Sequence, residues 1–416
     1  MVINKPTIEV RGDKTFLLSS VKDEITGNNE EFYFSVSNEY GKYLCNEVAD
    51  AFVIAMLLPA LVSGQNIKVD APISEMLSYQ LNNSLIFTFC KVFNKKPITI
   101  FPASTLSIDF NPEAVATGIS GGVDTFTTII THTSVNCPEG LRLTHLTLFN
   151  VGAYGNDETG SQKAFEADAV RAAQYAEYLG LPLVLLNSNI SKICVHKDIF
   201  HFVTRSIISI IAGIYSLQKL FKLYLISSGH TIDKTTLNRG FKRNLDQGRY
   251  DVLIASLFSN LNTRFIVANV NLNRVEKTKL IAEDKTARKF LYVCAADIYN
   301  EKHGTSYKKD TSPNCSECEK CTRTLLTLDV LGYLDEFSGR FDLRKYANLR
   351  KNLIIKVLNT YKKNHYFNEI HDLMIEKNYH IPNKYRLQAN ILKIKVWLVS
   401  FKLIRFIYRS VIRPAR

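Results

Sequence analysis

From residue 115 onward, short apolar runs alternate with longer segments whose apolar residues recur at helical spacing. The short runs predict buried strands, because they hold few polar positions and end at glycine, serine or asparagine. Strands that alternate with helices indicate a parallel, doubly wound sheet covered on both faces, which is an α/β fold. The expected strands are residues 115–119, 143–151, 183–186, 223–227 and 265–270, and the expected helices are 161–179, with Ser161 as N-cap and Gly180 as its stop, and 197–220.

The residues before Phe110 show another pattern. An apolar helix is expected at 48–62, where Pro59 should kink or end it. A second helix is expected at 73–81, with Ser74 as its N-cap. The pattern predicts a small α+β domain over residues 1–110, whose expected role is packing or contact with a partner. Short β-rich runs occupy residues 31–36, 66–69 and 97–101.

The end of the chain is expected to be helical, and it carries the positive charge. From Arg340 onward there are 18 Lys and Arg against 4 Asp and Glu, whereas the rest of the chain has 34 against 35. The net charge of +13 therefore belongs to this region, and the nearly neutral body argues against nucleic-acid binding. The expected domains are residues 1–110, 111–334 and 335–416, the last with helices at 340–363, 367–378 and 389–413 and a break at Pro382.

The last expected helix, residues 389–413, is amphipathic. On a helical wheel most of its basic residues share a sector of about 80°, separate from its aromatic and aliphatic residues. The pattern indicates an anionic membrane surface or an acidic partner protein, and a docking helix with solvated basic residues explains it equally well. The basic sector holds Lys395, Lys402, Arg405, Arg409 and Arg413, while Lys393 falls on the apolar side.

Composition sets the expected compartment. The chain is 46% apolar, but no run of 18 apolar residues predicts a transmembrane helix, and the first residues hold no apolar signal core. We therefore expect a cytoplasmic protein, attached to a membrane surface only if the basic helix binds lipid. In that compartment the eight cysteines should be reduced or metal-bound rather than disulfide-bonded.

The first strand of the α/β region runs into Ser120-Gly121-Gly122, and Asp124 and Thr125 follow at the start of an expected helix. A strand, a glycine turn and a helix start present bare backbone N–H groups to phosphate. The two glycines permit close approach, and the hydroxyls of Ser120 and Thr125 add donors. A carboxylate beside phosphates suits Mg²⁺, which is the role expected for Asp124.

Ligands of such sheets bind beyond the carboxyl ends of the strands. The segments that follow the strands are therefore candidates for the same site: the Ser120 loop and residues 150–154, 227–230 and 271–277. Lys277, after the fifth strand, is expected to neutralise pyrophosphate, although a charged helix start explains it too. Ser228-Gly229-His230 and Asp233 either face the nucleotide or form a solvated turn. His132 and His145 are expected to be structural.

Four cysteines form the second candidate site. Cys294, Cys315, Cys318 and Cys321 follow the pattern C-x20-C-x2-C-x2-C. Four thiolates at this spacing suit a tetrahedral Zn²⁺, and an iron–sulfur cluster is the chemical alternative. The other cysteines, which show no such spacing, are expected to be buried small apolar residues: Cys45, Cys90, Cys137 and Cys194.

The string from Ser120 to Thr125 resembles the SGGxDS signature of the PP-loop ATP pyrophosphatases, with Thr125 in place of the last serine. Together with the four cysteines and Arg323 behind them, it resembles the 7-cyano-7-deazaguanine synthase family over residues 114–334. The resemblance implies a Rossmann-like fold that uses ATP and Mg²⁺, and a structural zinc. Its implied nucleotide-binding residues are Ser120, Gly121, Gly122, Asp124 and Thr125, with Asp124 and Lys277 as catalytic residues, and its implied zinc ligands are Cys294, Cys315, Cys318 and Cys321.

This chain departs from that family in its length, its residues before the loop, its wider gap after Cys294 and the segment at residues 227–233. Larger relatives occur in anti-phage and polysaccharide gene clusters. The resemblance implies adenylation of a carboxylate or amide and its transfer to a nitrogen nucleophile, which is a small molecule or an amine on a partner protein. Two alternatives remain open at this point: a nucleotide-binding scaffold subunit of a defence complex, and an enzyme similar to the tRNA sulfurtransferases.

Overall fold

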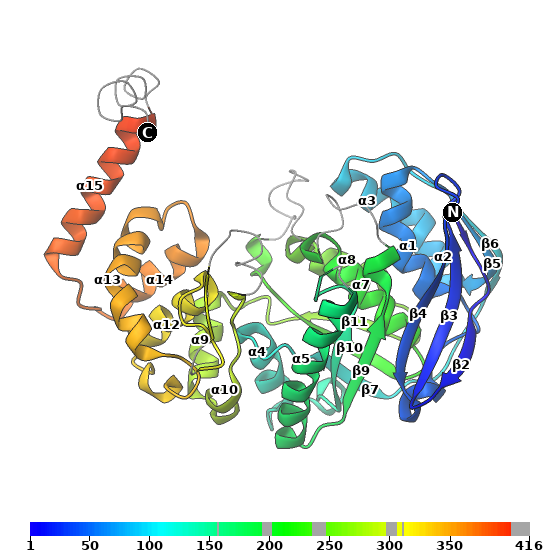
Figure 1. The fold of residues 1–416 in the computed structure, drawn as a ribbon, viewed down its shortest axis with the longest axis horizontal. Coiled ribbons are helices and arrows are strands. Elements are labelled where there is room, and N and C mark those ends of the chain that lie inside the picture. Colours follow the sequence, from blue (N-terminus) through cyan, green and yellow to red (C-terminus); the bar gives the residue numbers. More distant parts are fainter. Residues whose placement is uncertain (156–157, 194–201, 235–246, 297–305, 310–311, 401–416) are drawn as a thin grey trace. The chain divides into compact units, whose positions relative to one another are not determined.

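The computed structural model describes the chain apart from residues 156–157, 194–201, 235–246, 297–305, 310–311 and 401–416 (Figure 1). The chain divides into two compact units. Unit 1 comprises Met1–Ser120 and Asp124–Asn271, and unit 2 comprises Gly121–Val123 and Leu272–Arg416. The expected domain boundaries at residues 110 and 334 thus fall inside unit 1 and unit 2, respectively.

Unit 1 is built on one large, mostly parallel sheet, and within the described residues eleven strands belong to it. The order across the sheet is β11-β10-β7-β8-β9-β4-β3-β1-β5-β6, and β2 pairs with β3. The α/β class expected from the sequence is therefore confirmed. The strands are β1 (Val2–Ile3), β2 (Thr7–Arg11), β3 (Lys14–Lys22), β4 (Asn29–Ser37), β5 (Ile67–Ser74), β6 (Ile100–Leu106), β7 (Ala114–Gly118), β8 (His145–Asn150), β9 (Leu183–Ser188), β10 (Phe221–Ser227) and β11 (Arg264–Ala268).

The five strands β7 to β11 run parallel to one another and match the five strands expected from the apolar runs. Both faces of this part are covered, because consecutive residues of β10 are buried. Tyr224 and Ile226 belong to the large core that includes α7 (Phe202–Ser216), whereas Leu223 and Leu225 are buried outside that core. Such continuous burial is characteristic of a parallel sheet between two helical layers.

The order of these strands reverses at β7. From β7 the chain continues to β8 and β9 on one side, then returns to β10 and β11 on the other. This is the order of doubly wound folds, and the point of reversal, between β7 and β10, is where such sheets open a crevice for a ligand. The pairing of Thr117 with Leu225 places the carboxyl ends of these two strands side by side.

The N-terminal strands continue the same sheet instead of forming a sheet of their own. β4 pairs with β9 in antiparallel orientation, with Phe34 opposite Ser188 and Ser35 opposite Asn187. Residues 1–110 therefore share a sheet and a compact unit with the parallel strands, whereas the sequence pattern predicts a small α+β domain for them. The strands themselves agree with the β-rich runs at 31–36, 66–69 and 97–101.

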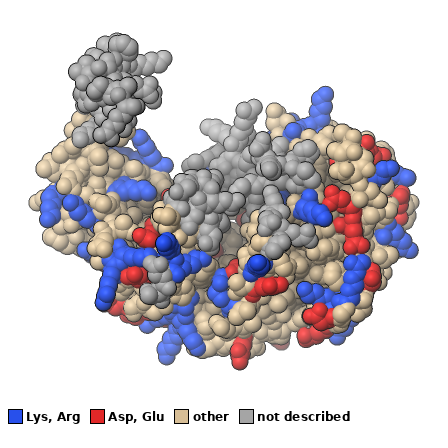
Figure 2. Space-filling view, viewed as in Figure 1, with Lys and Arg blue, Asp and Glu red and all other residues tan. Residues whose placement is uncertain are grey.

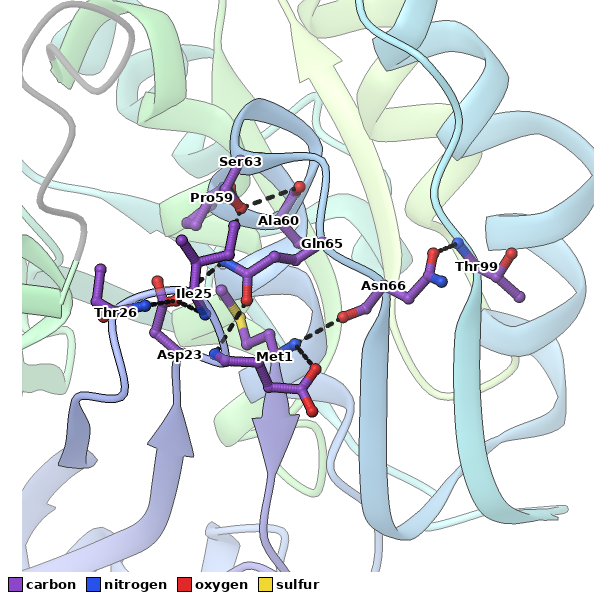
Figure 3. A network of polar contacts seen from close by, with 11 residues as sticks. Met1, Asp23, Ile25, Thr26, Pro59, Ala60, Ser63, Gln65, Asn66 and Thr99 are labelled. Atoms are coloured by element: carbon purple, nitrogen blue, oxygen red, sulfur yellow. Dashed lines mark hydrogen bonds and ion pairs between the residues drawn. The ribbon is translucent and has the colours of Figure 1, made fainter.

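A polar network fastens β1 to the turn after β3 and to the start of β5 (Figure 3). The Met1 ammonium donates to Glu24 Oε2 at 2.7 Å and to the Asn66 carbonyl at 2.9 Å. Gln65 Nε2 donates to Asp23 Oδ1 at 3.1 Å. Because these groups are partly buried, their pairing removes the penalty that unpaired polar atoms would carry at this end of the sheet.

Helices of unit 1 mostly agree with the sequence expectation. α1 runs four residues past Pro59, which therefore does not end it, and Ser74 caps α2 through the Leu77 N–H at 3.4 Å. Ser161 is not the N-cap of α5, since the helix begins three residues earlier. The bounds are α1 (Asp50–Ser63), α2 (Glu75–Gln80), α3 (Ile86–Phe93), α4 (Val123–Thr133, at the unit boundary), α5 (Glu158–Leu179), α6 (Ile190–Ile193), α7 (Phe202–Ser216) and α8 (Asp251–Phe258); residues 197–201 of the expected helix 197–220 lie outside the described residues.

Unit 2 is helical over its described residues. Asp329 Oδ2 accepts hydrogen bonds from Tyr346, Arg350 and Tyr379 at 2.6–2.7 Å, which joins three segments of the unit. The helices expected at 340–363 and 367–378 are present, and the last begins directly after Pro382. Residues 401–413 of the expected helix 389–413 lie outside the described residues. No helix in the described part of the chain is long and apolar enough to cross a bilayer. The helices are α9 (Arg274–Glu283), α10 (Lys285–Phe290), α12 (Glu319–Leu331), α13 (Leu343–Thr360), α14 (His365–Glu376) and α15 (Asn383–Ser400).

Candidate functional site

The glycine loop follows β7 at the carboxyl edge of the sheet, where the strand order reverses. Gly121 has φ of +73°, a left-handed conformation that a residue with a side chain adopts only at a cost. Helix α4 starts directly after the loop, at Val123. A helix N-terminus exposes backbone N–H groups that lack partners within the helix, and these favour an anion.

Two hydroxyls close the loop. The Oγ atom of Ser120, which is exposed, lies 2.8 Å from Oγ1 of Thr125, which is buried in the first turn of α4. Asp124 lies in the same turn and is half-buried. The structure thus brings together Ser120, Asp124 and Thr125 of the predicted nucleotide site in unit 1, while Gly121 and Gly122 belong to unit 2, where the Tyr292 N–H donates to the Gly121 carbonyl at 2.8 Å.

Hydrogen bonds tie α4 to the neighbouring strand ends. Oγ1 of Thr128, fully buried in α4, lies 2.9 Å from Oγ of Ser227, the last residue of β10. Asn269, just after β11, donates to Thr128 at 3.4 Å, and its carbonyl accepts from Ser228 at 3.1 Å. These bonds fix the middle of α4 against the carboxyl ends of β10 and β11.

Other residues expected at this edge take different places. Ser228 is buried, and Asp233 lies in an exposed one-turn helix of residues 232–234. Lys277 belongs to unit 2, where it lies in α9 with only 2% of its surface exposed. Asn273 and Glu276 form the capping box of that helix, so the charged start of α9 has a structural role alongside any functional one.

A polar cavity of about 270 Å³ lies at the carboxyl ends of β8 and β9, beside the strand that carries the loop. Asn150 donates to Asn187 at 2.7 Å, and Asn187 donates to Gln162 of α5 at 2.9 Å. Ser161 donates to Asn150 at 3.3 Å. The sequence reasoning reached Asn150 but missed Asn187; an asparagine near the end of a buried strand was the available signal.

The four cysteines converge in unit 2, although twenty residues separate the first two. The sulfurs of Cys294, Cys315, Cys318 and Cys321 all lie within 4.8 Å of one another, and those of Cys315 and Cys321 are 3.8 Å apart. Zinc–sulfur bonds of about 2.3 Å in a tetrahedron require sulfurs about 3.8 Å apart, which these positions approach. The cluster can therefore bind a metal ion such as zinc.

Backbone N–H groups surround the sulfurs, as they do in metal-binding knuckles. Those of Ala296 and Cys315 donate to Cys294 Sγ at 3.4 Å, and that of Cys318 donates to Cys315 Sγ at 3.2 Å. Asn314 supports the turn: its Oδ1 accepts from the N–H groups of Val293 and Cys294 at 2.8 and 3.0 Å. Such N–H donors stabilise negative charge on sulfur, which is the form that binds metal.

The proximity of the thiols also changes their acidity. A hydrogen bond with Cys315 is the largest cause that lowers the pKa of Cys294 to about 7. The pKa of Cys318 is also lowered, chiefly by Cys294, and this residue is the N-cap of α12, where the helix dipole favours a thiolate. The same contacts raise the pKa values of Cys315 and Cys321, so a bound cation has to displace the protons of these two thiols.

Comparison with known proteins gives no relative from which a function could be inferred. No match was found among protein-family models, curated proteins or solved structures. The assignment of the two candidate sites therefore rests on the residues and geometry of this chain alone.

The other described cysteines, and His132 and His145, lie away from the two candidate sites. Cys45, Cys90 and Cys137 are buried outside the cluster, and burial raises the pKa of Cys45 to about 12. Cys194 lies outside the described residues. His132 lies in the last turn of α4, where its Nδ1 is 3.0 Å from the Leu141 carbonyl, and His145 is the first residue of β8. Both histidines therefore lie away from the carboxyl edge of the sheet.

Proposed function

We propose that this chain is an ATP-dependent enzyme of the PP-loop type, which forms AMP and pyrophosphate. The observation that supports this most is the position of the glycine loop, at the reversal point between β7 and β10 and directly before the N-terminus of α4. A loop with the sequence Ser120-Gly-Gly-Val-Asp124 at that point joins the ligand-binding position of the fold to a phosphate-binding sequence.

In this proposal the carboxylate or amide oxygen of a substrate attacks the α-phosphorus of ATP, and pyrophosphate leaves. A nitrogen nucleophile then attacks the acyl carbon, and AMP leaves. The loop N–H groups and the hydroxyls of Ser120 and Thr125 bind the phosphates and stabilise their developing charge. Asp124 would hold Mg²⁺, which a half-buried carboxylate beside phosphates suits. No role is assigned to Lys277, whose side chain is buried in α9 of unit 2. No side chain forms a covalent intermediate.

The cavity at the ends of β8 and β9 bears on the second substrate, the one that carries the carboxylate or amide. The amide-lined cavity beside β7 supports a polar group that both donates and accepts hydrogen bonds, since Asn150, Gln162 and Asn187 offer both functions. A substrate similar to a carboxy-deazaguanine fits that description, as does a carboxamide on a partner protein.

We propose zinc for the cysteine cluster. One ion needs its four sulfurs close together, whereas in an iron–sulfur cluster the four cysteines bind two or four irons, and sulfurs on different irons stand farther apart. All four sulfurs lie within 4.8 Å of one another, which supports the single ion. Its role is structural, because four protein thiolates leave no open position for substrate.

Product analysis tests the proposed reaction. The purified full chain is incubated with ATP, Mg²⁺, a panel of carboxylic acids and hydroxylamine as a general nitrogen nucleophile. The expected products are AMP, pyrophosphate and a hydroxamate in equal amounts for at least one acid. ADP and phosphate as the products would show that the reaction is not of the PP-loop type. Binding of ATP with no turnover for any acid would favour the scaffold subunit.

A further inference from the structure

The last described helix, α15, has one buried side and a broad exposed side. It packs against α13 in unit 2, where Ala389 is 1% exposed (Figure 1). Leu387, Ile391 and Ile394 are exposed by 63%, 43% and 57%. Their spacing of four and three residues places them on one face of the helix, within about 60° of one another. Trp397, 58% exposed, lies about 60° beyond this stripe.

Exposed apolar residues are ordinary when scattered, but a continuous stripe on one helix is not. The helix is also apolar toward α13, where Leu392, together with Ile391 at the edge of the stripe, lines a groove with Ile355. Contact with α13 therefore covers only part of the apolar surface of α15. In the described residues of unit 2 nothing covers Leu387 and Ile394.

The charges around the stripe have a single sign. Lys384, Arg386 and Lys393 are exposed, and on a helical wheel they lie on both sides of the stripe, about 60–120° from Leu387. From Asn383 to the end the sequence has no Asp or Glu. Figure 2 shows many Lys and Arg and few acidic residues over this end of unit 2. The basic residues from Asn383 onward are Lys384, Arg386, Lys393, Lys395, Lys402, Arg405, Arg409, Arg413 and Arg416.

We propose that α15 lies in the headgroup region of an anionic phospholipid bilayer. An apolar stripe with a tryptophan beside it, flanked on both sides by Lys and Arg, is the arrangement of an interfacial helix: the apolar side chains reach the acyl boundary, and the cations bind lipid phosphates. The stripe lies on the convex surface of a helix, which suits a flat bilayer. An acidic protein would have to supply negative charge on both sides of an apolar groove.

The proposal needs no spanning segment, since no described helix could cross the membrane. The proposal is independent of the proposed reaction. It explains why the positive charge of an otherwise neutral chain is concentrated after residue 340. Each basic residue near an anionic membrane strengthens binding about fivefold, so reversal of two charges should weaken it by at least a hundredfold.

Vesicle flotation tests the proposal on the full chain. The vesicles are pure phosphatidylcholine, or phosphatidylcholine with 30% phosphatidylglycerol, at low and high salt. We expect flotation with the anionic vesicles at low salt and its loss with the neutral ones or at high salt. The double variant Leu387→Ser/Ile394→Ser should bind the anionic vesicles at least tenfold more weakly, and Lys384→Glu/Lys393→Glu should abolish binding.

Matched controls come from the same unit. Ile375 in α14 is 64% exposed and Lys351 in α13 is exposed, so Ile375→Ser and Lys351→Glu change similar side chains outside the stripe. Both should float like the wild type, and all variants should keep the wild-type melting curve. Equal losses in the controls, or wild-type binding by the stripe variants, would overturn the proposal. Retention on polyglutamate beads without flotation would also overturn it and would indicate an acidic protein partner.

Discussion

The glycine loop after β7 and the cysteine cluster of unit 2 are built in different ways. The loop owes its position to strand order: β7 carries it to the reversal point only because β8 and β9 lie on one side and β10 on the other. The geometry of the cluster depends on the short turn from Asn314 to Cys321. There, hydrogen bonds of Asn314 and of the backbone hold three cysteine sulfurs close to that of Cys294. The loop would bind its ligand mainly with backbone N–H groups, whereas the cluster would bind a metal ion with side-chain sulfurs.

This difference affects how each site should fail. A cluster of side chains loses its ligand when one side chain is changed, and the ligand is part of the fold that surrounds it. A backbone site keeps its shape after a side-chain change, and it loses function without loss of structure. Variants of Cys318 and Asp124 separate the two sites by this property, and variants of Asp50 and Thr128 test the sheet and helix that carry the loop.

Cys318→Ser should remove the metal and lower the free energy of unfolding of unit 2. We expect about one zinc per wild-type chain and almost none in the variant, because a hydroxyl is a poor replacement for a thiolate. The stability lost should be about 5 kcal/mol, less than the roughly 10–16 kcal/mol of zinc-finger peptides, since the helices of unit 2 also have an apolar core. Elemental analysis and thermal melting measure both quantities.

The control for this change is Cys90→Ser, which alters a buried cysteine of unit 1 outside the cluster. Its zinc content should equal that of the wild type. A brown wild-type protein that contains iron and acid-labile sulfide would contradict the zinc assignment. The same melting temperature with and without a strong chelator would contradict a structural role for the metal.

Asp124→Asn should abolish formation of AMP and leave the fold intact. Removal of one preorganised charged group at a reacting phosphate typically lowers the rate about 10²–10³-fold. Gly122→Ala should act in the same direction by obstructing close approach of the phosphates. Turnover of ATP and the melting temperature are measured together, because the account requires the first to fall while the second stays.

Glu139→Gln is the matched control, since Glu139 is an exposed acid beyond the other end of α4. It should keep full activity. If Asp124→Asn kept wild-type turnover, the loop would not hold the reacting phosphates. If it melted far below the wild type, the residue would be structural and the contrast with the cysteine cluster would disappear.

Asp50→Asn should stabilise unit 1 at neutral and alkaline pH. Complete burial raises the pKa of Asp50 from 3.8 to about 6, although Ser74 donates two hydrogen bonds to the carboxylate. The folded chain therefore holds a proton that the unfolded chain releases, so this stability is present below about pH 4 and is lost as the pH rises through 6. The full effect of about two pKa units is about 3 kcal/mol.

Urea denaturation at pH 5 and pH 8 measures this effect. The stability of the variant should exceed that of the wild type by more at pH 8 than at pH 5, because the neutral amide cannot ionise. The zinc content should not change. Equal differences at the two pH values would show that the Asp50 carboxyl does not titrate in this range.

Thr128→Val should weaken the attachment of α4 to the end of β10 by about 1–2 kcal/mol. The methyl group fills the space of the hydroxyl, but Ser227 and Asn269 lose a buried partner. Thr133→Val is the control, because Thr133 is exposed and bonds only its own helix in the described structure. Chemical denaturation distinguishes the two. A change no larger than that of Thr133→Val would mean that this bond does not position the loop.

The parallel strands and the helices after residue 340 could be predicted because each is a local pattern. An apolar run such as 223–227 is buried on both faces wherever it lies in the sheet, so its sequence reports the strand but not its neighbours. The pairing of β4 with β9 joins residues about 150 positions apart, and nothing in the local pattern of either strand indicates it. The sequence predicts Ser161 as an N-cap, but α5 begins at Glu158, and the Ser161 hydroxyl donates to Asn150 instead.

The candidate sites were predictable to different degrees for the same reason. The spacing of Cys315, Cys318 and Cys321 is a local feature, and the structure brings Cys294 to them as expected. The glycine loop was found from its sequence, yet its place beside β10 follows from strand order. Asn187 was missed because its part in the polar cavity depends on α5 and on β8, which are distant along the chain.

A crystal structure of the full chain with Mg²⁺ and α,β-methylene-ATP tests the central claim most directly, because this analogue cannot release pyrophosphate. We predict triphosphate density beyond the carboxyl ends of β7 and β10, with the N–H groups of the Ser120–Val123 loop on its oxygens and Asp124 toward the metal. Nucleotide bound elsewhere, with the glycine loop unchanged and empty of phosphate, would contradict the account.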